Sequence, residues 1–415
     1  MSTEETKADR GNEGQRRSAT PEEGLGLASL LDIEVDEARV NRLKSILQVD
    51  APDMSDEVFG WLIRQQVRWA NIQYTRFLAG AKFTENDVDD VLRGGVDGHV
   101  HGGSDPMERL MLEDDVAKDY TDAGMRAMVF KTWYTPSASR SALVQKAADR
   151  HAEERGVQPV EVFGGVTLNY SVGGFNPEAV KKCLGFPGMK YVWMPMVDSY
   201  HHRRVVYDDW SGYGLKFLDD QGKVIAPVQE ILRIIADNDL VLACGHYPYE
   251  DAAALVEEAR RLGVTRIELV HPAHIHSKHT IAQMKEQAQR GAKLMLSGLG
   301  TMAFPLHESG PLYAARIVKE VGASNLIYGS DLGQLQNPPH VVMNRWMVKL
   351  LFAYGCTKDE LKTVFQDSGR ELLGVATDGF PAPAGRDYRG HPQADPRARA
   401  LAHGGVPPEE PQQRP

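Results

Sequence analysis

Short apolar runs alternate with longer amphipathic stretches from Gly94 to Gly374, and this alternation repeats eight times. Apolar runs bounded by polar turns are typical of strands that are buried on both faces, and the amphipathic stretches are typical of helices that cover a sheet. The expected strands end at His101, Lys131, Asn169, Asp198, His246, His271, Gly298 and Asp331. The helix expected after the first strand spans residues 106–124.

Eight strand–helix units predict an α/β fold, the (β/α)8 TIM barrel, because parallel strands joined by right-handed crossovers close into a barrel at this number. A doubly wound open sheet is the alternative. It usually has fewer strands and a glycine-rich first turn, whereas the first turn here reads HVHGGSD and lacks a GxGxxG match. We therefore place a TIM-barrel catalytic domain at residues 94–375.

The segments on either side of the barrel differ from it in composition. Residues 1–24 are polar and charged, and residues 376–415 are rich in proline, glycine, arginine and acidic residues, so both are expected to be disordered tails. Residues 25–93 carry apolar side chains at helical spacing, as in DEVFGWLIRQQVRWANIQYTRFLAG. This pattern predicts an N-terminal helical extension, which packs on the barrel, forms a homo-oligomer interface or covers the active site.

Charge and cysteine content exclude several classes of protein. The chain has 47 Lys+Arg and 57 Asp+Glu, a formal net charge of -10, so neither nucleic acid nor an anionic membrane is an expected partner. Its three cysteines form no CxxC pair, which argues against a disulfide framework and a thiolate zinc site. No signal-peptide core and no membrane-spanning run stands out. We expect a cytoplasmic protein that acts on a small-molecule substrate.

Side chains that can bind a metal occur at the ends of four expected strands. His99 and His101 are two residues apart on an extended segment, so their side chains point the same way. His246, His271 and Asp331 end strands five, six and eight. Because the carboxyl ends of barrel strands meet at one mouth, these five residues predict a metal site there. Imidazole and carboxylate ligands without thiolate favour zinc, manganese, iron or cobalt over calcium.

The loop between the fourth strand and its helix, residues 199–223, is long and rich in aromatic and charged side chains. Its DDQG turn signal predicts a hairpin, and its place after a strand predicts a lid over the active site. Arg203 and Arg204 in this lid, and Tyr247 after strand five, are candidates for substrate contact. Other histidines of these loops are interpreted mainly as loop residues or supports of the ligands (His274, His276, His279) or as less constrained lid residues (His201, His202).

The DGHVH segment, the histidines that end strands five and six, and the aspartate of YGSD at strand eight resemble the amidohydrolase superfamily of metal-dependent TIM-barrel hydrolases. The resemblance covers residues 94–374 and leaves out the helical extension and the tails. It implies that His99, His101 and Asp331 hold one divalent ion, zinc foremost. It also implies that His246 and His271 hold a second ion or flank a single one.

The fourth strand departs from the superfamily pattern. Binuclear members usually carry a carboxylated lysine or a glutamate at its end, whereas here it reads VWMPMVD, with Asp198 as the nearest carboxylate. Lys131 ends the second strand instead. A buried lysine beside a metal is repelled unless it is carboxylated or displaced toward the substrate. Lys131 is thus a bridging metal ligand, a contact to a substrate anion or a structural lysine.

The resemblance implies a metal-dependent hydrolase that uses metal-activated water to cleave an amide, lactam, lactone or related ester bond. Asp331 would accept the proton of that water and pass it to the leaving group, with His271 as a second catalytic residue. The missing ligand on strand four favours an alternative, an amidohydrolase-related metal-dependent decarboxylase, in which His271 donates the proton. A non-catalytic metal-binding scaffold is the third alternative.

Overall fold

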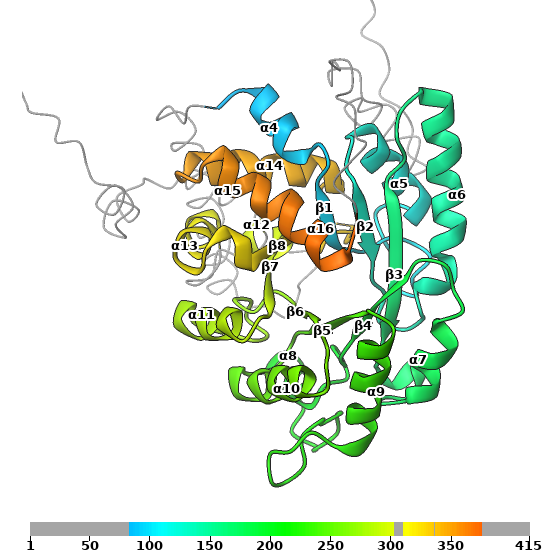
Figure 1. Ribbon diagram of the computed structural model, residues 1–415, viewed down its shortest axis with the longest axis vertical. Helices are drawn as coiled ribbons and strands as arrows, with labels where there is room; N and C mark the ends of the chain where they lie inside the picture. The colour runs from blue at the N-terminus through cyan, green and yellow to red at the C-terminus, as the bar shows by residue number, and fades with distance from the viewer. Residues whose placement is uncertain (1–82, 303–309, 336, 376–415) are drawn as a thin grey trace, which may run out of the picture. The chain divides into compact units, whose positions relative to one another are not determined.

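The structure, a computed structural model of the chain, describes residues 83–302, 310–335 and 337–375. Eight parallel strands lie in sequence order, and helices surround them (Figure 1). The strands are β1 (Val96–Val100), β2 (Ala127–Phe130), β3 (Glu161–Thr167), β4 (Met189–Trp193), β5 (Val241–Cys244), β6 (Arg266–Leu269), β7 (Lys293–Ser297) and β8 (Leu326–Gly329).

The barrel closes where the end of β8 meets β1. The backbone N–H of Asp331 donates to the carbonyl oxygen of His99, and the N–H of His101 donates to the carbonyl oxygen of Leu332, each at 2.8 Å. Val100 and Leu332 form a parallel bridge at the same place. The predicted (β/α)8 TIM barrel is therefore confirmed, and its closing contacts lie beside three of the predicted metal ligands.

Helices cover the outside of the barrel because each presents an apolar stripe to the strands. In α9, for example, Val228, Ile231, Leu232 and Ile235 recur at helical spacing and are all buried. The described helices are α4 (Glu85–Leu92), α5 (Glu113–Asp122), α6 (Ala138–Arg155), α7 (Pro177–Cys183), α8 (Tyr200–Val206), α9 (Ala226–Asp237), α10 (Tyr249–Arg261), α11 (Ile281–Gln289), α12 (Gly298–Met302), α13 (Pro311–Val321), α14 (His340–Ala353), α15 (Lys358–Lys362) and α16 (Ser368–Leu373), with a π-helical turn at Thr363–Asp367.

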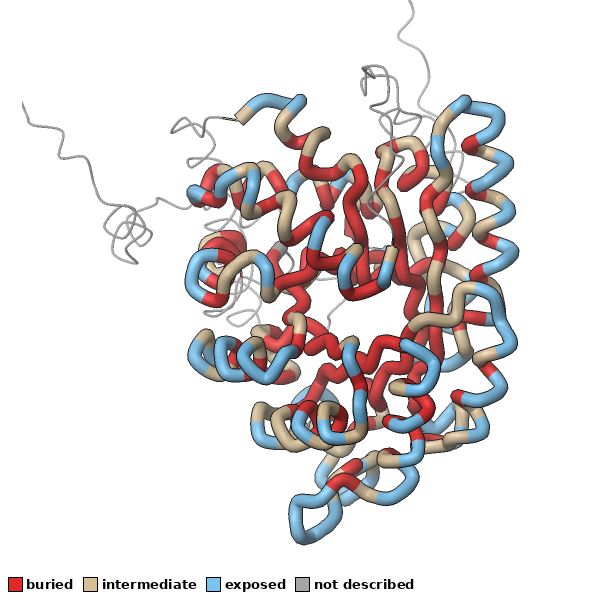
Figure 2. Tube along the Cα trace, viewed as in Figure 1, coloured by how far each residue is buried: buried red, intermediate tan, exposed pale blue. Residues whose placement is uncertain are grey.

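The core lies both within the barrel and between its strands and helices. The strands are buried almost throughout, whereas the helices alternate buried and exposed residues (Figure 2). Inside the barrel the rings of Tyr191 and Trp193 stack with 4.9 Å between their centroids. This packing fills the interior, so chemistry is confined to the mouth formed by the loops after the strands.

Two loops at this mouth differ from the sequence expectation. The helix after β1 begins at Glu113 rather than at residue 106, because the preceding segment hydrogen-bonds to other loops: the N–H of Leu110 donates to the carbonyl oxygen of Gly333 at 2.9 Å. The predicted lid starts with helix α8, which the sequence analysis did not foresee. Its hairpin is a single antiparallel bridge between Leu218 and Val224.

Several predicted segments fall outside the described residues. These are both tails and residues 25–82 of the helical extension, of which α4 and the residues next to it are described. All described residues belong to one compact unit. Within the described part of the chain, no helix is both long and apolar enough to cross a membrane.

Candidate metal centre

The first group of metal-competent side chains, here called the Asp331 group, comprises His99, His101 and Asp331. Each offers one ligand atom within 4.8 Å of the others. The Oδ1 atom of Asp331 lies 3.2 Å from Nε2 of His101 and 3.4 Å from Nε2 of His99. Two ligand atoms held at about 2.0–2.1 Å by one tetrahedral ion are roughly 3.4 Å apart. These separations therefore fit one ion.

The hydrogen bonds of His101 determine which ring nitrogen is free to bind a metal. Its Nδ1 lies 2.9 Å from the carbonyl oxygen of Lys131, so Nδ1 carries the proton and donates. In the neutral ring, Nε2 then presents a lone pair toward Asp331. A lone pair facing a carboxylate oxygen is repulsive unless a cation lies between them. This donation to a backbone carbonyl is also typical of metal-binding histidines.

His99 supports the same assignment. It is fully buried, and neither of its ring nitrogens has a hydrogen-bond partner among the described residues. A buried polar group left unpaired costs about 1–3 kcal/mol. An ion bound at Nε2 would satisfy that nitrogen, so the donors of the Asp331 group fit a divalent metal.

A second group, here called the tri-histidine group, comprises His202, His246 and His276. Their ligand atoms also lie within 4.8 Å of one another, and Nδ1 of His202 is 2.6 Å from Nδ1 of His246. His246 was a predicted ligand. His276, from the loop after β6, is interpreted in the sequence as a loop residue or a support of the ligands, and His202, from α8, as a less constrained lid residue. The structure thus places His246 with two histidines that were not predicted to be metal ligands.

His271 lies between the two groups. Its ring centroid is 5.0 Å from that of His246 and 6.1 Å from that of His99, and its Nε2 is 3.8 Å from Oδ2 of Asp331. Its Nδ1 has no hydrogen-bond partner in the described part of the chain. The five predicted ligands therefore lie at one mouth. Three of them form the Asp331 group, one belongs to the tri-histidine group, and His271 stands between.

Backbone conformation at this mouth is unusual. His246, His271 and Asp331 have φ angles of 63°, 32° and 56°, in the left-handed region that residues with a side chain seldom adopt. Such conformations cost on the order of 1–3 kcal/mol each and cluster at functional sites. Three of the predicted ligands are therefore held in place at an energetic cost, which is expected where function requires the side-chain direction.

Electrostatics keep the imidazoles neutral and the carboxylate ionised. Burial lowers the pKa of His99 and of His246 well below the usual value, and lowers that of His271 to about 3. Burial raises the pKa of Asp331, but attraction to the protonated form of the neighbouring imidazoles, His99 foremost, outweighs burial and holds the pKa well below its usual value, so that the carboxylate is ionised. Neutral imidazole and ionised carboxylate are the forms that bind metals.

Lys131 is 1% exposed, and its charge acts on histidines of both groups. Burial lowers its pKa to about 8, against the opposing effect of Asp331 and Glu268. Its charge in turn lowers the pKa of histidines in both groups. Glu268, inside the barrel on β6, is fully buried, and burial raises its pKa to about 8. Whether Lys131 is a metal ligand stays a prediction.

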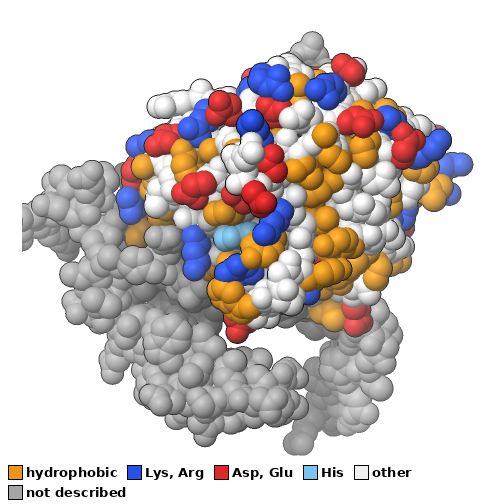
Figure 3. All heavy atoms as spheres, turned by 90° about the horizontal axis from the view of Figure 1, so that it is seen from below, with side chains coloured by type: hydrophobic (Ala, Val, Ile, Leu, Met, Phe, Trp, Pro, Cys, Tyr) orange, Lys and Arg blue, Asp and Glu red, His pale blue; other side chains and the backbone are white. Residues whose placement is uncertain are grey.

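The predicted substrate contacts lie in different environments. Arg203 donates to Asp209 at 2.8 Å and lies over the ring of Tyr213, 4.5 Å from its centroid. Arg204 lies over the ring of Trp210 at 3.9 Å. Tyr247 is buried, and its ring packs against Phe217 in the core with 4.7 Å between centroids. Figure 3 shows histidine at the surface between lysine and arginine side chains.

Arg109 was missed by the sequence analysis. It was placed in the expected first helix, but it lies in the loop after β1, where Asp105 accepts from its Nη2 at 2.7 Å. The same nitrogen is 3.5 Å from Nδ1 of His101. The sequence did contain a signal for this position of Arg109, namely a cationic residue in the loop that follows the HxH pair.

Two buried networks hold the Asp331 group in place. Asp97 on β1 accepts from the N–H of Ser330 at 2.8 Å and from the hydroxyl of Tyr120 at 2.6 Å, which ties β1 to the end of β8. Burial raises the pKa of Asp97 to about 6. His340 at the start of α14 lies with its Nε2 3.0 Å from the carbonyl oxygen of His101.

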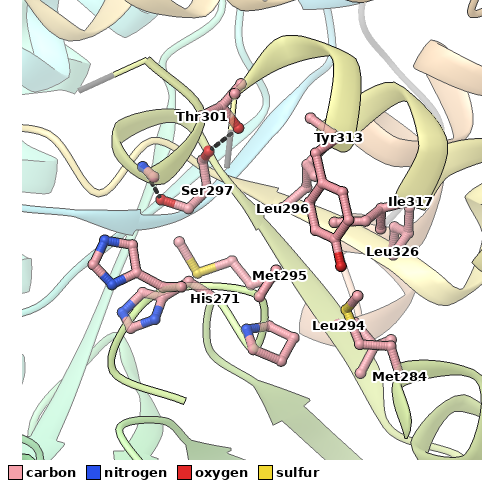
Figure 4. Close-up of a pocket in the computed structure, with 16 residues that line it drawn as sticks. His271, Met284, Leu294, Met295, Leu296, Ser297, Thr301, Tyr313, Ile317 and Leu326 are labelled. Atoms are coloured by element: carbon pink, nitrogen blue, oxygen red, sulfur yellow. Dashed lines mark hydrogen bonds between the residues drawn. The ribbon is translucent and has the colours of Figure 1, made fainter. Parts of the chain in front are cut away.

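A mainly apolar cavity of about 40 Å³ lies beside His271 and extends between β7 and the helices α11 and α13 (Figure 4). Leu294 and Leu296 of β7 and Ile317 of α13 line it. The hydroxyl of Thr301 donates to the carbonyl oxygen of Ser297 at its rim. Holding one water requires roughly 10–15 Å³, so the cavity can accept a small group next to His271.

Comparison with known proteins gives a family match and distant structural likenesses. The family described as "Family of unknown function (DUF6282)" matches residues 94–295, which include both histidines of the Asp331 group and the whole tri-histidine group but not Asp331. No curated protein matches the chain.

Three solved structures are among those similar to the chain. An amidohydrolase from Burkholderia multivorans with bound zinc is 14% identical, covering 68% of this chain and 99% of its own, with a TM-score of 0.44. A lactonase from Listeria monocytogenes is 13% identical, with coverages of 70% and 97% and a TM-score of 0.44. An amidohydrolase from Mycoplasma synoviae is 12% identical, with coverages of 69% and 88% and a TM-score of 0.46. Likenesses this distant assign neither a reaction nor a substrate.

Proposed function

We propose that this chain is a metal-dependent hydrolase of the amidohydrolase type, which cleaves an amide, lactam, lactone or related ester bond in a small molecule. The observation that carries the proposal is the Asp331 group, in which the free nitrogen of His101 faces an ionised carboxylate at 3.2 Å. A divalent ion held by this group, zinc foremost, would supply the Lewis acidity that activates water and polarises a carbonyl oxygen.

The side chains around this group have separate tasks in the reaction. Asp331 is ionised at neutral pH, so its carboxylate can accept a proton from the attacking water. Neutral His271 has its Nε2 3.8 Å from Oδ2 of Asp331. It is positioned to take that proton from Asp331 and give it to the leaving group. Arg203 and Arg204 in the lid and Tyr247 are our candidates for substrate contact. Lys131, if carboxylated, would join the metal ligands.

One observation favours the decarboxylase as a second candidate. The end of β4 contributes no carboxylate and no lysine to either group in the described residues. Asp198, the nearest carboxylate after β4, accepts from the N–H of Tyr170 at 2.8 Å. A site without a bridging ligand on this strand suits single-ion chemistry, which the lyase uses.

Isotope labelling separates the two reactions. The metal-loaded chain is incubated in ¹⁸O-labelled water with cyclic amides, lactones and aromatic carboxylic acids, and the products are analysed by mass spectrometry. Hydrolysis places solvent oxygen in the product, which is the result we expect. Release of CO₂ without incorporation of solvent oxygen would replace the hydrolase with the lyase.

A further inference from the structure

The tri-histidine group has the composition of a metal site that no ligand motif of the sequence accounts for. Its members come from three places at the barrel mouth: His246 follows β5, His202 lies in α8 and His276 follows β6. Centroids of the three rings are 4.5–5.0 Å apart. His202 and His246 are buried, each with 3% exposure. His276 is partly buried. Three converging imidazoles of this kind are uncommon as mere packing, because each ring carries polar nitrogens that need partners.

The nitrogens of this group are not fully satisfied by the protein. Nδ1 of His276 is buried without a hydrogen-bond partner in the described part of the chain. The 2.6 Å contact between Nδ1 of His202 and Nδ1 of His246 is shorter than an ordinary N–H···N hydrogen bond. Two ligands of one tetrahedral ion would stand roughly 3.4 Å apart, so these rings need to separate by less than about 1 Å to bind one.

Ligand chemistry narrows the choice of ion. Three neutral imidazoles suit zinc, copper, nickel, cobalt or iron, and they disfavour calcium and magnesium, which require oxygen ligands. Three protein ligands leave a fourth position open, which is the arrangement of catalytic rather than closed structural zinc sites.

We propose that His202, His246 and His276 bind a divalent transition-metal ion of their own, distinct from the ion of the Asp331 group. Ligands from the lid and from the loop after β6 take the place of His271, which the resemblance to the superfamily pairs with His246 around a second ion or beside a single one. His271, 5.0 Å from His246 and 6.1 Å from His99 between ring centroids, then separates the two ions.

Metal counting tests this inference without any assay of activity. The full-length chain is stripped with a chelator, reloaded with zinc, desalted and analysed by mass spectrometry for ions per chain. We expect two ions in the wild type, one in His202→Gln, one in His276→Gln and one in His99→Gln. The double variant His99→Gln/His276→Gln should retain none. His151→Gln is the matched control, because His151 lies on α6 near Asp122, away from both groups, and should keep two.

Reloading with cobalt adds a spectroscopic measurement. The visible absorption of cobalt reports its ligands, so His276→Gln should remove the component of the nitrogen-only site and leave that of the Asp331 group. Circular dichroism verifies that each variant is folded. Should a variant fail to fold, anomalous scattering from zinc-loaded wild-type crystals gives the answer, with a peak expected about 2.0–2.1 Å from a nitrogen of each of the three rings.

Three results would overturn the proposal. The first is a wild type with one ion or none. The second is two ions that persist in His202→Gln and His276→Gln. The third is an anomalous peak shared by His246 and His271 without His202. None of these depends on turnover, so the hydrolase proposal can fail for lack of activity while the tri-histidine site stands, and the reverse is equally distinguishable.

Discussion

The Asp331 group and the tri-histidine group lie at the same barrel mouth but differ in charge and in origin. The Asp331 group contains an ionised carboxylate, whereas the tri-histidine group offers only neutral imidazoles. Two opposite unit charges 4 Å apart attract by about 4 kcal/mol at an effective dielectric constant of ~20. We therefore expect the carboxylate to make the Asp331 group the tighter of the two proposed metal sites, and it is also the group able to accept a proton. At the tri-histidine group we expect weaker binding of the ion.

Asp331→Asn should have the largest effect of the substitutions proposed here, because it removes what distinguishes the Asp331 group from the tri-histidine group. The change removes the negative charge, a metal ligand and the proton acceptor together, so we expect the catalysed rate to fall by at least the roughly 10²–10⁴-fold that general acid–base catalysis supplies. Steady-state kinetics measures the rate, and metal analysis should show one ion lost.

The matched control is Asp219→Asn, in the exposed turn of the lid, which should leave rate and metal content unchanged. If Asp331→Asn kept its full rate and both ions, the Asp331 group would not be the catalytic centre, and the contrast between the two groups would lose its basis.

Predictability from sequence also differs between the two groups. The ligands of the Asp331 group lie at the ends of strands: His99 is inside β1, and His101 and Asp331 come just after β1 and β8. A strand is recognised by its apolar run, so both the barrel and the position of its mouth could be predicted. The fold is confirmed, while the metal-binding roles of the five predicted ligands stay predictions.

The tri-histidine group depends on loop paths that carry no periodic signal. His202 reaches the mouth because α8 begins after Ser199, whose hydroxyl accepts from the N–H of His202 at 3.1 Å. A serine before a short polar stretch was a usable helix-start signal, but nothing indicated where the helix would lie. His276 follows a turn in which the N–H of His274 donates to the carbonyl oxygen of His271. Tertiary packing, not local sequence, brings these rings together.

His340→Phe should have an intermediate effect on metal affinity, and we expect it at the Asp331 group alone. Nε2 of His340 lies 3.0 Å from the carbonyl oxygen of His101 and 2.9 Å from that of Leu332. These contacts fix the backbone where the end of β8 meets β1, beside the Asp331 group. Loss of a partner that positions a ligand typically costs 10–100-fold in metal affinity. We expect that loss, on the order of 1–3 kcal/mol, at the Asp331 group and no change at the tri-histidine group.

Competition with a chromogenic chelator, applied to the wild type and to His340→Phe, resolves the two affinities. His340→Gln serves as the control, because its amide retains a donor for the two carbonyl oxygens and should recover part of the affinity. Equal weakening at both groups would show that His340 supports the whole mouth rather than the Asp331 group alone.

Lys131→Met should have the smallest effect of the three substitutions. It tests the charge of Lys131, which acts on both groups. Burial lowers the pKa of Lys131 to about 8, so at pH 7 the amine is protonated in most molecules. Its positive charge repels a cation at either group. Methionine has a similar length and no charge. We expect both ions to remain and both to bind more tightly, by about tenfold or less, which corresponds to about 1.4 kcal/mol or less. The gain should be larger at the tri-histidine group, where no carboxylate offsets the lysine charge.

Titration of the stripped chain with zinc, followed by metal analysis, measures count and affinity in the same experiment. Lys190→Met is the matched control, because Lys190 on β4 donates to the carbonyl oxygen of Asp239 at 2.8 Å and should change neither quantity. If Lys131→Met lowered the count from two ions to one, and bicarbonate aided reloading of the wild type, Lys131 would be a carboxylated ligand that bridges the groups. The Asp331 and tri-histidine groups would then form one bridged centre, because a carbamate adds a negative charge where the free amine adds a positive one.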